Sequence, residues 1–180
     1  MTGRIRRALC GAWRCFWRRR DPWIMLIGGG ILLLLSAVVR GVCGSPYRGE
    51  AVLFLRSFFP PIWLLSLLWS VWYFVLGALF GGVMLPWGGS RVISFRCSER
   101  YFGGMLFVAM ILLGFLWYPL FFVAARYVLC FLLGCLIFLL CLGCAYRYFR
   151  VSALFGTALL LYGGFLLWLL FLNARLLFWL

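Results

Sequence analysis

The sequence predicts an all-α integral membrane protein, built as a bundle of five transmembrane helices. Three observations support this fold class. The 180-residue chain is 67% hydrophobic with a mean hydropathy of +1.12, its charges lie mainly between apolar runs, and those runs have the length of membrane spans. A soluble domain is about half apolar, so this chain has more apolar surface than a core of its size can bury. A lipid bilayer is the solvent that such a composition favours.

Five apolar runs have about the 20 residues that a spanning helix needs. We expect helices at about 22–40, 60–85, 101–121, 127–146 and 152–174. Together they form a single transmembrane domain, 22–174. An Arg-rich segment, 1–21, precedes this domain, and a short tail, 175–180, follows it.

Arginine determines the expected topology, because all 17 basic residues are Arg. Seven precede the first run, three lie in a predicted loop at about 86–100, and two lie at 146–150. A cytoplasmic N-terminus places these on one side and leaves five on the other, as the positive-inside rule favours. The first run is long for a signal peptide and no A-x-A site ends it, so we expect a retained helix. The expected location is a bacterial plasma membrane.

Missing residue types exclude several functions. With no Lys there is no retinal-type Schiff base, and with no His there is no imidazole ligand or base. No Asp or Glu lies inside an apolar run, which argues against an ion-coupled pump. The sequence lacks a basic face with interleaved aromatic residues, which is the pattern that would indicate a nucleic-acid partner.

The eight cysteines do not form a metal-binding pattern. Cys141 and Cys144 have CxxC spacing, but no His or second pair accompanies them, so we interpret them as small buried residues and expect no metal site. Cys10 and Cys15, beside the first run, are candidate palmitoylation sites.

The second run begins with two prolines and then carries aromatic residues with polar tips. Proline is tolerated in the first turn of a helix, so Pro60 and Pro61 are expected to start this one. Trp63 suits the interfacial belt. Farther in, helical spacing aligns one face, which consists of Ser66, Trp69, Tyr73 and Gly77.

Two other spans offer matching faces. The third aligns Met110, Gly114, Trp117 and Phe121, and the fifth places Tyr162 and Asn173 on one face with Leu169 and, less directly, Phe165. These faces predict either ordinary aromatic packing or a pocket for a flat, largely apolar ligand. Gly77-x-x-x-Gly81 indicates either a close helix contact or a dimer face.

Two motifs give the chain a family resemblance. One is F-x-P-P-x-W-x₅-W-x₃-Y-x₃-G, formed by Phe58, Pro60, Pro61, Trp63, Trp69, Tyr73 and Gly77, and the other is WYPLFF at 117–122. With Tyr162, Leu172 and Asn173, they make residues 56–174 resemble the TspO/MBR family of tryptophan-rich sensory proteins and mitochondrial translocator proteins.

The resemblance implies a five-helix bundle, often a homodimer, that binds porphyrins, other tetrapyrroles or sterols in a pocket near one end. It implies ligand-binding roles for Phe58, Pro60, Pro61, Trp63, Ser66, Trp69, Tyr73, Gly114, Trp117, Phe121, Tyr162, Phe165 and Asn173. No cofactor is required, and a tetrapyrrole is the expected ligand. The carboxylates of such a ligand would depend on loop arginines such as Arg48 and Arg56.

Departures from the family pattern favour binding over catalysis. Some members are reported to degrade porphyrin through two pocket tryptophans, of which one corresponds to Trp69 and the other to Phe165. The family's Gln and Asn on the third helix correspond to Met110 and Gly114. The leading hypothesis is therefore a sensory or binding protein for a planar ligand. The alternatives are a tetrapyrrole-degrading enzyme that uses Trp69, and a passive transporter or scaffold.

Overall fold

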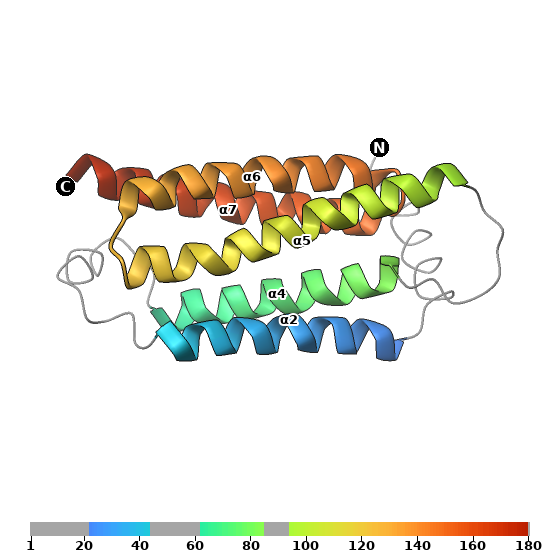
Figure 1. Cartoon of the computed structure of the whole chain (residues 1–180), viewed down its shortest axis with the longest axis horizontal. Helices are drawn as coiled ribbons and strands as arrows, with labels where there is room; N and C mark the ends of the chain where they lie inside the picture. The colour runs from blue at the N-terminus through green and yellow to red at the C-terminus, as the bar shows by residue number, and fades with distance from the viewer. Residues whose placement is uncertain (1–21, 44–61, 85–93, 180) are drawn as a thin grey trace, which may run out of the picture.

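The computed structural model describes residues 22–43, 62–84 and 94–179, which form helices, and short turns join the last three of these helices (Figure 1). In chain order these are α2 (Pro22–Cys43), α4 (Ile62–Met84), α5 (Ser94–Phe122), α6 (Tyr127–Phe149) and α7 (Ala153–Trp179). All five are long and apolar enough to cross a membrane. The all-α, five-helix membrane fold predicted from the sequence is confirmed.

Four helices extend farther than the hydropathy of the sequence indicated, with α2 continuing to Cys43, α6 to Phe149, and α5 and α7 farthest of all. α5 begins at Ser94, so part of the expected loop at 86–100 is helical, and α7 continues through the expected tail to Trp179. Hydropathy marks where lipid contact ends, whereas a helix satisfies its own backbone groups and can continue into the headgroup region. α4 begins at Ile62, directly after Pro60 and Pro61, which lie outside the described residues.

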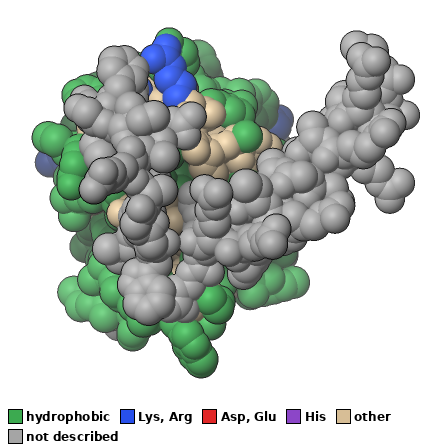
Figure 2. All heavy atoms as spheres, turned by 90° about the vertical axis from the view of Figure 1, so that its right-hand side faces the viewer, with side chains coloured by type: hydrophobic (Ala, Val, Ile, Leu, Met, Phe, Trp, Pro, Cys, Tyr) green, Lys and Arg blue, Asp and Glu red, His purple; other side chains and the backbone are tan. Residues whose placement is uncertain are grey.

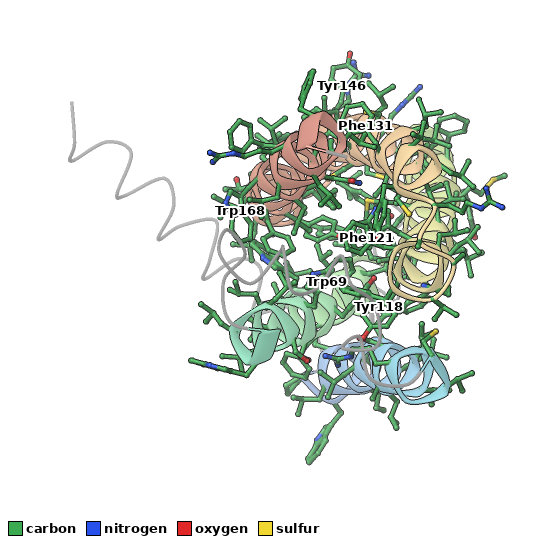
Figure 3. All side chains as sticks on the ribbon, turned by 90° about the vertical axis from the view of Figure 1, so that its left-hand side faces the viewer. Trp69, Tyr118, Phe121, Phe131, Tyr146 and Trp168 are labelled. Carbon is green, nitrogen blue, oxygen red and sulfur yellow. The ribbon has the colours of Figure 1, made fainter. Side chains whose placement is uncertain are left out.

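The helices form two groups. α2 packs along α4, while α6 packs along both α5 and α7, and the contacts between the two groups are fewer (Figure 1). The end-on view shows the α2–α4 pair on one side of the bundle interior and α5, α6 and α7 around the other (Figure 3). Side chains therefore bridge a seam between the two groups, and the candidate site lies in this seam.

Glycines hold α2 and α4 together. A Cβ placed on Gly77 would lie 2.4 Å from the carbonyl oxygen of Gly28, and a Cβ on Gly28 would lie 2.6 Å from that of Gly77. Gly81 faces the backbone of Ile24 in the same way, at 3.0 Å. The Gly77-x-x-x-Gly81 motif thus forms a close contact between helices of one chain.

Aromatic rings fill the end of the seam near the start of α2. Phe80 of α4 stacks on Phe107 of α5 at 4.4 Å, and Phe107 meets Phe155 of α7 edge-on at 5.7 Å. Phe107 and Phe155 are 2% or less exposed. This end of the seam is closely packed.

The outer surface of the bundle is apolar. Leucine side chains on several helices, such as Leu34, Leu112 and Leu161, are more than 60% exposed. Hydrophobic side chains cover the flanks in the end-on space-filling view (Figure 2). Exposure of this kind suits contact with lipid tails.

Candidate functional site

A cavity of about 240 Å³ lies between α2, α4 and α5, near the ends of α2 and α5 and the start of α4. It is partly open and partly enclosed by these helices. Half of its lining residues are aromatic, and serines and an arginine supply a polar side. The lining residues are Ser36, Val39, Arg40, Leu65, Ser66, Trp69, Tyr73, Gly114, Phe115, Trp117, Tyr118 and Phe122.

A second, smaller cavity lies deeper in the bundle. Its volume of about 20 Å³ has room for about one water molecule. It shares Trp69, Gly114 and Trp117 with the first cavity, and its other walls come from α6 and α7, with Gly134, Ile137, Tyr162, Leu166, Leu169, Leu170 and Asn173. Trp69, Gly114 and Trp117 therefore form the wall between the two cavities.

The partition is a stacked pair of indoles. The rings of Trp69 and Trp117 lie 5.7 Å apart with an interplanar angle of 22°, and Figure 3 shows Trp69 directed into the bundle interior. Trp117 is fixed on its other side, because its Nε1–H donates to the carbonyl oxygen of Cys130 at 3.1 Å and its ring stacks on Phe121 at 4.8 Å. A flat apolar surface is thus held in place beside the larger cavity.

The polar side of the larger cavity is organised around Arg40. Its Nε donates to the Ser36 carbonyl at 3.3 Å, and its Nη2 donates to the Ser70 hydroxyl at 2.9 Å. Nη1 donates to the carbonyl oxygen of Ser66, at 3.1 Å, and to its hydroxyl. Ser70 in turn donates to the Ser66 carbonyl at 2.8 Å. These bonds connect α2 to α4 and hold the guanidinium at the cavity.

Two buried polar groups at the cavities lack a hydrogen-bond partner among the described residues. The hydroxyl of Tyr73, a residue only 3% exposed, is one of them, and Tyr73 lines the larger cavity. The other is the amide of Asn173, which is 1% exposed and lines the smaller cavity. Buried polar atoms are usually paired with protein or water, so both cavities favour a guest that has a polar atom.

The structure brings most of the predicted site residues together. Ser66, Trp69, Tyr73, Gly114 and Trp117 line the larger cavity. Tyr162 and Asn173 line the smaller one with Trp69, Gly114 and Trp117. Phe121 and Phe165 line neither cavity but support the wall, since Phe121 stacks on Trp117 and Phe165 meets Trp69 edge-on at 6.2 Å.

The structure does not bring Trp63 to either cavity. Its side chain is 69% exposed on the first turn of α4, the position of an interfacial tryptophan. Phe58, Pro60 and Pro61 lie outside the described residues, as do the loop arginines Arg48 and Arg56.

Sequence reasoning missed the polar side of the cavity. The positive-inside count includes Arg40 only as one of the five arginines opposite the N-terminal side. The signal was available, because Ser36 and Arg40 are four residues apart, as are Ser66 and Ser70 on the next helix. That spacing places each pair on one helix face.

The cysteines of the CxxC motif have separate neighbours. The Cys141 thiol lies 3.2 Å from the Leu159 carbonyl oxygen on α7, whereas the Cys144 thiol lies 3.8 Å from that of Gly103 on α5. Within the described ranges no group of three His, Cys, Asp or Glu residues is placed to hold a metal ion. The two thiols pack against different helices, as small buried residues do.

Comparison with curated proteins and with solved structures found no match. The TspO/MBR family model, by contrast, matches residues 51–179, well over half of the chain, and this match includes four of the five helices described above. The match confirms the resemblance seen in the motifs at 58–77 and 117–122: the chain belongs to the TspO/MBR family.

Proposed function

We propose that this protein is a membrane-embedded sensory or binding protein for a flat hydrophobic ligand of the porphyrin class, held in the cavity between α2, α4 and α5. The observation that carries the proposal is the stacked pair of Trp69 and Trp117 beside an open cavity. A fixed indole surface is well suited to a planar conjugated ligand, because stacked aromatic rings gain about 0.5–1.5 kcal/mol beyond area burial.

The size of the cavity indicates how such a ligand enters. Small-molecule sites usually have volumes of roughly 300–1,000 Å³, and this one has about 240 Å³. A whole tetrapyrrole is larger than that. We therefore expect one edge of the ring to insert against the wall while the rest lies in the open mouth. A sterol-like lipid is the second ligand class that this shape can accept.

The test compares two tryptophan variants of the purified protein, titrated with protoporphyrin and monitored by the porphyrin absorption band. Trp69→Phe removes an indole from the cavity wall, whereas Trp63→Phe removes an exposed indole on the same helix. We expect saturable binding that Trp69→Phe weakens by roughly tenfold and Trp63→Phe leaves unchanged. Absence of saturable binding, or equal effects of the two substitutions, would refute the proposal.

Catalysis has less support than binding. Phe165 stands where the resemblance predicts the second reactive tryptophan, and a phenyl ring is harder to oxidise than an indole. Illumination of the porphyrin complex in air tests this alternative. A new absorbing product that disappears in Trp69→Phe would establish the enzymatic function, and a labelled porphyrin crossing liposomes would indicate a passive transporter.

The orientation proposed from the sequence has a consequence for the cavity. Arg40, Arg126 and Arg175 lie at the end of the bundle that carries the cavity, and Arg147 and Arg150 lie at the other (Figure 1). With a cytoplasmic N-terminus in a bacterial plasma membrane, the cavity is near the outer face. A homodimer would need a surface other than Gly77-x-x-x-Gly81, since that motif contacts α2 of its own chain.

A further inference from the structure

The larger cavity contains a positive charge that is held by neutral groups. Arg40 lines the cavity, and its guanidinium carries the charge. Its hydrogen-bond acceptors are serine oxygens of residues 36, 66 and 70. No side chain that the structure describes carries a carboxylate, and Glu99, the one acid on a described helix, lies at the far end of α5 from the cavity.

The serines fix the guanidinium without using all of its donors. A guanidinium has five N–H groups, and the bonds to Ser36, Ser66 and Ser70 use one on Nε, two on Nη1 and one on Nη2. One N–H of Nη2 has no acceptor among the residues that the structure describes. The Ser66 hydroxyl accepts from Nη1, so its own proton is available to donate. A held cation with two neighbouring donors is a preorganised site for an anion.

We propose that Arg40 and Ser66 bind a carboxylate of the ligand whose flat apolar body lies against Trp69 and Trp117. This inference rests on the proposed function and adds to it the chemical class of the ligand, an amphipathic carboxylic acid. Arg40 is partly buried, so its guanidinium has lost part of its contact with water, and a carboxylate offsets that loss through charge-assisted hydrogen bonds. The Tyr73 hydroxyl, buried in the same cavity without a partner among the described residues, offers a further contact for a polar atom of the ligand.

The experiment uses two porphyrins with the same ring. Protoporphyrin carries carboxylates, and its dimethyl ester carries none. Each is titrated into native protein and into Arg40→Gln, in nanodiscs of phosphatidylcholine alone. For each protein we take the ratio of the affinity for the acid to the affinity for the ester. Dividing the native ratio by that of the variant removes the partitioning of each porphyrin into lipid, because partitioning is the same for both proteins. We expect native protein to favour the acid by roughly ten- to a hundredfold relative to Arg40→Gln, with the affinity for the ester unchanged.

The outcomes separate this inference from the proposed function. If neither porphyrin binds to native protein, the proposed function fails. If both bind and the acid-to-ester ratio is the same in native protein and Arg40→Gln, the proposed function survives and the carboxylate site is refuted. Binding of the ester shows that Arg40→Gln has folded. If that variant cannot be purified, Arg40→Lys replaces it, because a lysine keeps the charge but lacks the planar fork of donors. We then expect Arg40→Lys to have a lower acid-to-ester affinity ratio than native protein. An unchanged ratio refutes the carboxylate site.

Two other partners for Arg40 are tested in the same assay. Glu50 lies outside the described residues, and Glu50→Gln is expected to leave the affinity for the acid unchanged. A loss in Glu50→Gln as large as that in Arg40→Gln would contradict the proposal. Nanodiscs that contain phosphatidylglycerol test a lipid headgroup. If anionic lipid lowers the affinity for the acid tenfold in native protein but not in Arg40→Gln, headgroup and carboxylate compete for Arg40, and this result supports the site.

Discussion

The two faces of α4 are built in opposite ways. Toward α2, Gly77 and Gly81 let backbones touch, with no room for even one added carbon at Gly77. Toward α5 and α7, the same helix projects Trp69, Trp72 and Tyr73 into a seam that contains both cavities. Small residues produce a contact that tolerates no change, while large rings leave irregular gaps between them. The first face stabilises the fold, and the second provides space for a ligand.

The largest expected effect is on the glycine contact. In Gly77→Ala the new Cβ would lie 2.4 Å from the Gly28 carbonyl oxygen, so two backbones must separate. Overpacking costs about 1–3 kcal/mol when side chains can adjust, and here they cannot. We expect a loss of about 3 kcal/mol or more and a midpoint of thermal unfolding lowered by roughly 10 °C. Gly30→Ala is the control, because nothing lies within 4 Å of its Cβ position. A similar small change of the unfolding midpoint in both variants would contradict the close backbone contact at Gly77.

The next effect concerns the fixed side of the aromatic wall. Trp117→Phe keeps a ring but removes the Nε1–H that donates to the Cys130 carbonyl oxygen. Loss of a buried hydrogen bond costs about 1–3 kcal/mol, so we expect a loss of roughly 2 kcal/mol in the free energy of unfolding. Trp168→Phe, at a ring that is 38% exposed, should change it far less. Equal losses would show that the bond contributes nothing specific.

A glycine in the seam should behave unlike a glycine in the α2–α4 contact. The Cβ of an alanine at position 114 would meet only the Tyr73 hydroxyl, at 3.2 Å, and Gly114 lines both cavities. In Gly114→Leu we therefore expect a folded protein whose affinity for protoporphyrin falls at least tenfold, about 1.4 kcal/mol, because the side chain occupies ligand space. Porphyrin titration and thermal unfolding measure the two properties. If Gly114→Leu instead lowers the midpoint of thermal unfolding and its folded fraction still binds protoporphyrin with native affinity, Gly114 belongs to a packing contact and not to the ligand site.

The smallest effect is expected behind the wall. Asn173→Leu replaces a buried amide, whose two polar atoms lack partners among the described residues, by an apolar group of similar size. We expect the free energy of unfolding to rise by about 1 kcal/mol, and the affinity for protoporphyrin to fall less than in Trp69→Phe. A decrease in stability would instead mean that the amide is satisfied in the native protein, for example by a water molecule in the smaller cavity.

Helical periodicity was enough to predict the fold and much of the aromatic site. Apolar runs of about 20 residues determine where helices cross a membrane, and i, i+3, i+4 spacing determined that Ser66, Trp69 and Tyr73 share a face. Helix ends were less predictable, because Ser94 and Trp179 lie in stretches where the surroundings change but the backbone hydrogen bonding does not.

Pairing between helices could not be derived from spacing within one helix. The sequence left open whether Gly77-x-x-x-Gly81 meets a neighbouring helix or a second chain, and only the position of Gly28 answers that question. Arg40 was missed for the same reason. Its role depends on Ser66 and Ser70 of another helix, whose distance from it depends on how α2 and α4 pack.

The bond between Trp117 and Cys130 makes one side of the cavity stiff. Cys130 lies in the first turn of α6, just beyond the short turn in which Ala125 has a φ of 50°. A ligand that pushes the Trp117 ring aside must give up a hydrogen bond to the main chain, whereas one that enters beside the ring leaves that bond intact. Under the proposed function, we therefore expect the thickness of a ligand to limit binding before its polar groups do. Bulky, non-planar molecules are expected to bind more weakly even where their polar groups match Arg40.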